Sequence, residues 1–134
     1  MNIGEAAKAS GLSPKMIRWY EEQGLIPRPP RSEGGYRVYG PKDIERLRFI
    51  RRARDLGFGV RQIGQLLALW QDRGRASADV KRLALEHAAA LEARIEALRG
   101  ILAAIRHLAE HCHGDARPDC PILEHLAHDQ EEHP

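Results

Sequence analysis

The sequence predicts a mainly α-helical protein, with a winged helix-turn-helix domain over 1–75, one long helix over 76–111, and a loop with a short C-terminal helix over 112–134. Two short helices around a glycine turn fit the first 26 residues, and an apolar repeat continues without a break through 84–109. Charge divides the chain at the same place. Residues 1–75 carry 15 Lys and Arg against 8 Asp and Glu, whereas residues 76–134 carry 6 against 11. A basic half of this kind favours a polyanionic partner, with a solvated basic face as the alternative.

Size and composition exclude several classes of protein. The 134 residues amount to about one domain, which is too small for a large enzyme with a separate cofactor domain. With 43% hydrophobic and 30% charged residues, the chain is too apolar for wholesale disorder. It has no apolar run of about 18 residues, no secretory signal pattern, and too few cysteines to staple a secreted scaffold. We therefore expect a soluble, cytoplasmic protein without a membrane partner.

The first 26 residues are typical of a helix-turn-helix. A first helix over 3–10 ends at Gly11, which tolerates a left-handed backbone, and Ser13 then caps a second helix that begins at Pro14 and ends near Gln23. Because any short helical hairpin can have this spacing, the spacing alone is only a moderate indication of a DNA-binding motif. We expect the following residues on or near the outer face of the second helix, which in such domains enters the major groove of DNA: Lys15, Arg18 and Tyr20.

The segment after the second helix predicts a small β-hairpin. Residues 31–39 alternate around the pair Gly34-Gly35, which suits a turn with positive φ. Because two strands alone are marginally stable, the hairpin is expected to lean on the helices as a wing. Its tip would expose Tyr36 and Arg37, an aromatic ring and a cation suited to the sugar-phosphate backbone.

Two more helices are predicted after the wing, over 41–56 and 60–70. Both place apolar side chains on one face, and the first crowds arginines around the rest of its surface. Arg54, near the end of that helix, is a candidate phosphate contact. The expected inward residues are Ile44, Leu47, Ile50 and Leu56 on the first helix, and Ile63, Leu66, Leu67 and Trp70 on the second.

A long helix from Ser77 is predicted by a strict heptad pattern. Its apolar residues recur at alternating steps of four and three. About 35 residues of helix extend for roughly 50 Å, too far for the small N-terminal domain to cover. The sensible partner is the same helix of a second copy, which gives a homodimer, but periodicity alone leaves parallel and antiparallel pairing open. The repeat consists of Ala84, Ala88, Leu91, Ile95, Leu98, Leu102, Ile105 and Ala109.

Both cysteines of the chain enclose one loop, from Cys112 to Cys120. Cys120 precedes Pro121 and is expected to cap a short helix, whose backbone N–H groups favour a thiolate. Two thiols without an evident third ligand suit a soft monovalent ion such as Cu(I). Zinc remains open, because nearby histidines could complete its shell, and so do a regulatory disulfide or two inert cysteines. The histidines, whose roles the sequence leaves open, are His111, His113, His125, His128 and His133.

Taken together, these motifs resemble the MerR family of transcription regulators, and within it the copper-efflux branch. The resemblance covers nearly the whole chain. It implies that the long helices pair as an antiparallel coiled coil. The matching stretches are residues 3–7, 17–26 and 54–58, the wing residues Arg31, Gly35, Tyr36, Arg37 and Tyr39, and finally Cys112, Cys120, Pro121 and Ile122.

The resemblance also implies residue roles. It implies that Cys112 and Cys120 bind the metal. Ser77 is the residue found in sensors of Cu(I), Ag(I) or Au(I), whereas sensors of divalent zinc or mercury carry a cysteine there. The implied DNA-contacting residues are Lys15, Arg18, Tyr20, Arg31, Tyr36, Arg37 and Arg54.

The implied function is transcription activation by a DNA-bound homodimer. Metal binding would bend and untwist a promoter with an overlong spacer, so that RNA polymerase engages both promoter elements. A zinc-responsive or thiol-redox regulator of the same family is the alternative, and a constitutive DNA binder or a metal buffer is a further one. An enzyme is not expected, because no nucleophile–base pair or phosphate-binding loop is visible.

Overall fold

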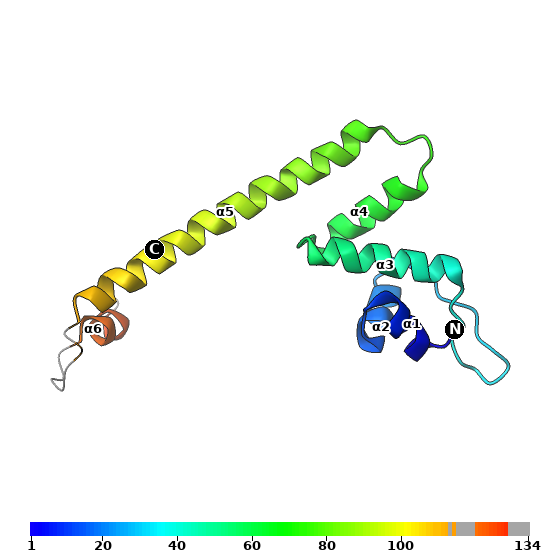
Figure 1. Ribbon diagram of the computed structural model, residues 1–134, viewed down its shortest axis with the longest axis horizontal. Helices are drawn as coiled ribbons and strands as arrows, with labels where there is room; N and C mark the ends of the chain where they lie inside the picture. Colours follow the sequence, from blue (N-terminus) through cyan, green and yellow to red (C-terminus); the bar gives the residue numbers. More distant parts are fainter. Residues whose placement is uncertain (113, 115–119, 129–134) are drawn as a thin grey trace. The chain divides into compact units, whose positions relative to one another are not determined.

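The computed structural model describes residues 1–112, 114 and 120–128 and divides the chain into two compact units, Met1–Leu85 and Glu86–Pro134. The described residues form six helices, and Figure 1 shows α5 as one continuous helix. Every helix that the sequence predicts is present, with ends within one residue of the expected ones. The three-part division at residues 75 and 111 stays a prediction. The helices are α1 (Ile3–Ser10), α2 (Pro14–Glu22), α3 (Pro41–Asp55), α4 (Val60–Gln71), α5 (Ser77–Glu110) and α6 (Pro121–Ala127).

Local capping explains where the first two helices begin and end. The Asn2 side chain accepts from the Glu5 N–H at 2.8 Å, and the Glu5 carboxylate accepts from the Asn2 N–H at 2.9 Å. Gly11 ends α1 with a left-handed φ of 82°. The Ser13 hydroxyl then accepts from the Met16 N–H at 3.2 Å and starts α2.

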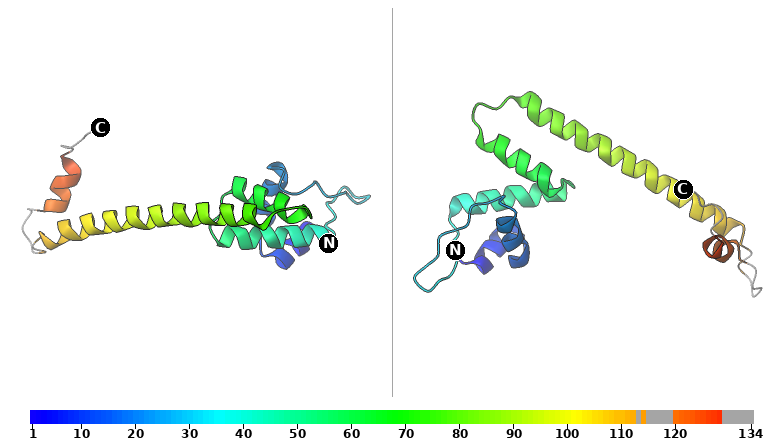
Figure 2. Two further views of the ribbon diagram at one scale, coloured as in Figure 1. Left: turned by 90° about the horizontal axis from the view of Figure 1, so that it is seen from above. Right: turned by 180° about the vertical axis from the view of Figure 1, so that it is seen from behind.

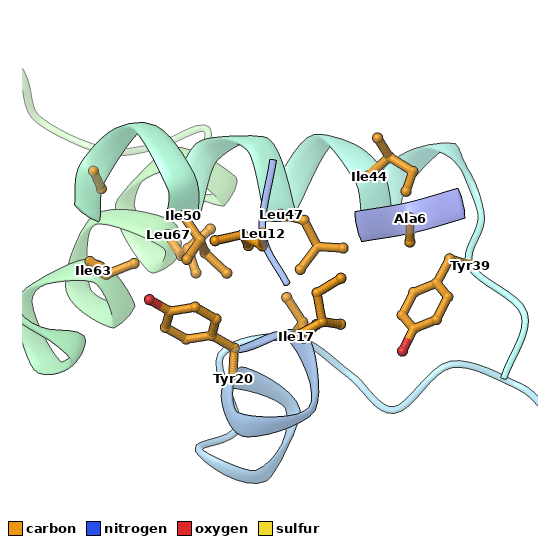
Figure 3. Packing of buried hydrophobic residues seen from close by; sticks show 12 residues of the cluster. Ala6, Leu12, Ile17, Tyr20, Tyr39, Ile44, Leu47, Ile50, Ile63 and Leu67 are labelled. Atoms are coloured by element: carbon orange, nitrogen blue, oxygen red, sulfur yellow. The ribbon is translucent and has the colours of Figure 1, made fainter. Parts of the chain in front are cut away.

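The core of the N-terminal unit lies where α1 packs against α2 and α3, and α3 packs against α4. Figure 3 shows its apolar side chains meeting between these helices, and the largest that are fully buried are Leu12, Ile17, Leu47, Ile50 and Ile63. Burying side chains of this size contributes about 1.5–3 kcal/mol each. The core therefore fixes α2 within the N-terminal unit and sets which face of α2 remains in solvent.

Two side chains expected in this core lie elsewhere. Leu56 is 66% exposed, because α3 ends at Asp55 and the spacing of its apolar face no longer applies to the residue after it. Trp70 is 42% exposed, because its ring stacks on Phe49, with centroids 4.6 Å apart, and Phe49 is itself only partly buried at the edge of the core. The inward placement of Leu56 and Trp70 was therefore wrong.

The wing between α2 and α3 contains no β-strand, although all of its residues are described. Instead, Arg31 and Arg37 form one isolated antiparallel bridge. The Ser32 N–H donates to the Tyr36 carbonyl at 2.7 Å and the Val38 N–H to the Pro30 carbonyl at 2.8 Å. The expected hairpin is thus reduced to a paired loop, which extends away from the helices in Figure 2. A pairing this short gives little rigidity of its own.

Helix α5 keeps most of its apolar repeat in solvent within a single chain. Leu98 is 64% exposed, and the other large residues of the repeat are also exposed, namely Leu91, Ile95, Leu102 and Ile105. An apolar stripe of this length is unusual for a surface that stays in water. None of the helices in the described part of the chain has the length and hydropathy that a membrane span requires.

Candidate DNA-binding surface and metal centre

The solvent-facing side of α2 carries two cations and an aromatic ring. Lys15, Arg18 and Trp19 are all exposed, and together with Met16 and Glu22 they surround a depression in the surface. Their spacing of three and four residues places them on one helical face. Trp19 was missed in the sequence analysis, although the same spacing from Lys15 would have identified it. This face offers cations for phosphate and guanine together with an apolar ring for a thymine methyl group.

Tyr20 does not belong to that face. The residue is only 3% exposed, and in Figure 3 its ring points from α2 toward the side chains of α3 and α4. The reason is helical spacing, because Tyr20 follows the fully buried Ile17 by three residues and so shares its inward side. The expectation that Tyr20 lies on the outer face was wrong, and its position gives no support to a contact with DNA.

The tip of the wing presents an aromatic ring to solvent. Tyr36 is 73% exposed and follows a turn in which Gly35 has a φ of 81°, a conformation that disfavours other residues. The Arg31 guanidinium Nη1 donates to the Gly35 carbonyl at 2.8 Å and so closes the turn. Arg31 thus has a structural contact, and its remaining donors stay available on an exposed side chain.

Arg37 is held differently from the expectation that it stands free at the tip. Its Nε donates to Oε1 of Glu21 on α2 at 3.0 Å, and the Tyr39 hydroxyl donates to Oε2 of the same carboxylate at 2.5 Å. Burial, and then the hydrogen bond to Glu21, raise the pKa of Tyr39 well above its ordinary value, while the charges of Arg37 and Arg18 act in the opposite direction. Glu21 therefore joins the wing to α2.

The remaining predicted DNA residue, Arg54, is exposed near the C-terminal end of α3. The structure thus gathers Lys15 and Arg18 on one helical face, and connects Arg37 to that helix through Glu21. It places Arg54 on a separate helix of the same unit.

The two cysteines come together in the C-terminal unit. The sulfur atoms of Cys112 and Cys120 lie 3.9 Å apart as free, half-buried thiols. Cys112 follows the end of α5, and Cys120 caps α6 as expected. The backbone N–H of Leu123 is the main cause that lowers the pKa of the Cys120 thiol, because it donates to the thiolate. Since an ion bound to two sulfurs at about 2.3 Å allows a separation up to roughly 4.6 Å, one ion fits between them.

No third ligand joins the thiols within the described ranges, where no group of three His, Cys, Asp or Glu side chains is placed to hold a metal. The ring of His111 instead lies against that of His107, tilted by 47° with centroids 4.2 Å apart, and His128 lies 3.2 Å from the Glu124 carboxylate. His113 and His133 lie outside the described residues.

Comparison with known proteins assigns the chain to a family. Residues 1–70 match the family model "MerR HTH family regulatory protein", and residues 44–108 match "MerR, DNA binding". The chain belongs to the MerR family. Its N-terminal unit with α1 to α4 is accordingly the helix-turn-helix part of a MerR-family transcription regulator.

Three known transcription regulators are similar to nearly the whole chain. Heavy metal-dependent transcription regulator 2 of Rhizobium meliloti is 61% identical, over 95% of this chain and 86% of that protein. The regulator CueR of Escherichia coli O6:H1 is 46% identical, over 95% and 94% respectively. The solved structure of PbrR691 from Ralstonia metallidurans in complex with lead(II) superimposes with a TM-score of 0.81 at 33% identity, covering 94% of this chain and 98% of that one. These relatives are named as regulators of transcription rather than as enzymes.

Proposed function

We propose that this MerR-family protein is a Cu(I)-responsive transcription activator of metal-efflux genes in the cytoplasm, which also accepts Ag(I) or Au(I). The observation that carries the proposal is the pair of free thiols, Cys112 and Cys120, whose sulfurs lie 3.9 Å apart. Thiolates are soft ligands that select soft ions such as Cu(I) over hard divalent cations. The relatives support metal dependence, since one is named as heavy metal-dependent and another was solved with lead(II).

The donor set favours a monovalent over a divalent ion. Two thiolates and one monovalent cation carry a net charge of −1, which the backbone N–H groups near Cys120 help to stabilise. A divalent ion attracts further ligands, and Zn²⁺ usually takes four. In the described part of the loop no such ligand is placed. Ser77 points in the same direction, because the resemblance associates a cysteine at this position with divalent ions.

We propose that the protein acts as a homodimer through α5. A second copy of the helix would bury the exposed apolar repeat that includes Leu98 and Ile105, in the antiparallel coiled coil that the resemblance implies. A two-fold dimer also presents two copies of α2 and two wings to a promoter with two half-sites. In this arrangement, residues 1–75 would bind DNA, residues 76–111 would form the dimer, and residues 112–134 would bind the metal.

The proposed DNA surface consists of the α2 face, the wing and the end of α3. Lys15, Arg18 and Trp19 would enter the major groove, and Tyr36 would contact the backbone. Arg31, Arg37 and Arg54 would bind phosphates. Metal binding would then change how the dimer bends and untwists the promoter, which aligns the two elements that RNA polymerase reads.

The experiment that tests the metal is an anaerobic titration of the reduced protein. Cu(I) and, separately, Zn(II) are added against a competing chelator, to the wild-type chain and to Cys112→Ser and Cys120→Ser. We expect one tightly held Cu(I) per protomer, lost in both variants and little affected by zinc. Tight zinc binding with weak Cu(I) binding would replace the copper assignment by the zinc-responsive alternative. A protein that binds neither ion would be a redox-responsive or constitutive DNA binder.

A further inference from the structure

The carboxylate of Glu21 is the link between the wing and the proposed recognition helix α2. Its side chain is 5% exposed, and both of its oxygens are used: Oε1 accepts from Arg37 at 3.0 Å and Oε2 from the Tyr39 hydroxyl at 2.5 Å. Arg37 and Tyr39 are two residues apart on an extended segment, so both face the same side of the wing. One side chain of α2 thus holds the wing at two points.

The wing depends on this link because it has little structure of its own. Its pairing is limited to the single bridge between Arg31 and Arg37 and a few backbone hydrogen bonds. Two-stranded pairs are marginal without further support. Burying the Glu21 carboxylate costs free energy unless it is paired with a charge and hydrogen-bonded. Arg37 supplies the charge and Tyr39 the second hydrogen bond, so Glu21 strongly favours one position of the wing.

The geometry leaves the other side of the Arg37 guanidinium available. An arginine has five N–H donors in a planar fork, and the hydrogen bond to Glu21 uses Nε. The Arg37 side chain remains 28% exposed. Arg18 precedes Glu21 by three residues on α2, and residues at this spacing are neighbours on a helix surface. Arg18 of α2 and Arg37 of the wing therefore both lie near the Glu21 carboxylate.

We propose that Glu21 is a positioning residue that holds the Arg37 guanidinium so that its outer N–H groups bind a DNA phosphate next to the groove that α2 enters. This inference rests on the proposed DNA surface. An arginine held by a carboxylate binds the phosphate with less loss of side-chain freedom than a mobile one, because its orientation is already set. Glu21 itself does not touch DNA.

A double-mutant cycle tests this role on the full chain. The probe is a DNA duplex enriched from random-sequence DNA by the wild-type protein, and binding is measured as a function of salt for wild type, Glu21→Gln, Arg37→Gln and the double variant. In the wild-type background, we expect Arg37→Gln to weaken binding about tenfold and to lower the slope of log K against log salt by about one, as for one lost phosphate contact. In the Glu21→Gln background, the same change is expected to cost less than twofold.

Tyr39→Phe is the matched control, because it removes the other hydrogen bond to Glu21 and leaves the ion pair with Arg37. Thermal unfolding is recorded for every variant. We expect Tyr39→Phe to lower thermal stability while DNA affinity stays within threefold of wild type, and Glu21→Gln to weaken DNA binding about as much as Arg37→Gln.

Several outcomes would overturn the role of Glu21. One is that Arg37→Gln weakens DNA binding equally in the wild-type and Glu21→Gln backgrounds, or in neither. Another is that Glu21→Gln binds DNA more tightly than the wild type. A third is that Tyr39→Phe loses as much DNA affinity as Glu21→Gln. If the wild-type chain enriched no duplex at all, the proposed DNA surface itself would fail, which is a different result.

Discussion

Arg48 of α3 donates its Nε to the carbonyl oxygen of Ala9 at 3.0 Å, at the C-terminal end of α1. Arg51, one turn later, donates Nη1 to the carbonyl of Gly11 and pairs with Asp55 at 3.1 Å. The last carbonyls of a helix have no partners within it and carry the negative end of the helix dipole, so cations there are stabilising. Arg48 and Arg51 therefore stabilise the packing of α3 against the end of α1.

Arg51→Gln is expected to lower the free energy of unfolding by about 1 kcal/mol, because it removes a charged donor from the end of α1. Arg52→Gln is the control, since Arg52 is an exposed neighbour on the same helix, and it is expected to stay within about 0.5 kcal/mol of wild type. Urea unfolding of the full chain measures both. Equal losses in the two variants would show that the contact with Gly11 contributes nothing specific.

Gly11 is expected to be intolerant of a side chain for two reasons. Its φ of 82° is unfavourable for other residues, and a Cβ there would lie 2.7 Å from Nη1 of Arg51. Gly11→Ala should therefore destabilise the protein by about 1–2 kcal/mol. Gly64→Ala on α4 should instead stabilise it by about 0.5–1 kcal/mol, since nothing lies within 4 Å of the added Cβ and alanine is the better helix former. Thermal unfolding measures the stability of both variants. A Gly11→Ala variant more stable than the wild type would contradict the role given to Gly11.

Helix ends were predictable because they depend on local chemistry. Ser13 with Pro14 starts α2, and Gly11 ends α1, through contacts between residues near in sequence. The two thiols were also predicted as a pair. Their 3.9 Å separation required the structure, because it depends on how α6 is placed against the end of α5.

Long-range contacts explain what the sequence could not show. Tyr20 was placed outward by its neighbours in the motif, although its spacing from Ile17 already indicated the core. The partner of Arg37 is Glu21, sixteen residues earlier, and no local pattern specifies such a pair. The wing lacks strands for a related reason, since strand formation depends on packing as well as on alternation.

Leu98→Glu is expected to weaken the proposed dimer at least a hundredfold, because it buries a charge in the apolar repeat of α5. Ala93→Glu is the matched control. It introduces the same charge on the same helix, at an exposed position on the side away from the repeat, and should change dimer affinity less than twofold. Sedimentation at several concentrations gives both values. A monomeric wild type, or equal effects of the two changes, would exclude pairing through this stripe.

Cys120 is expected to lose its proton at a lower pH in the folded protein than in the unfolded one, mainly because the Leu123 N–H stabilises the thiolate. Such a shift adds stability that is fully present above the ordinary thiol pKa, about 8.5, and is lost as pH falls through the lowered pKa. Alkylation of the metal-free Cys112→Ser variant measures this. Its rate should reach half-maximum below the pH found for the same variant in urea, and coinciding profiles would contradict the shift.

Ser77→Cys tests why the proposed site prefers monovalent ions. The resemblance implies that a thiolate at the start of α5 joins the cysteine pair across the dimer and supplies a further ligand. Because Zn²⁺ gains from additional thiolates and a two-coordinate Cu(I) does not need them, Zn(II) affinity should rise at least tenfold while Cu(I) affinity changes less than threefold. Ser77→Ala should leave both affinities near wild type, which separates the added thiol from the lost hydroxyl. Unchanged zinc binding by Ser77→Cys would mean that metal preference is set within the 112–120 loop alone.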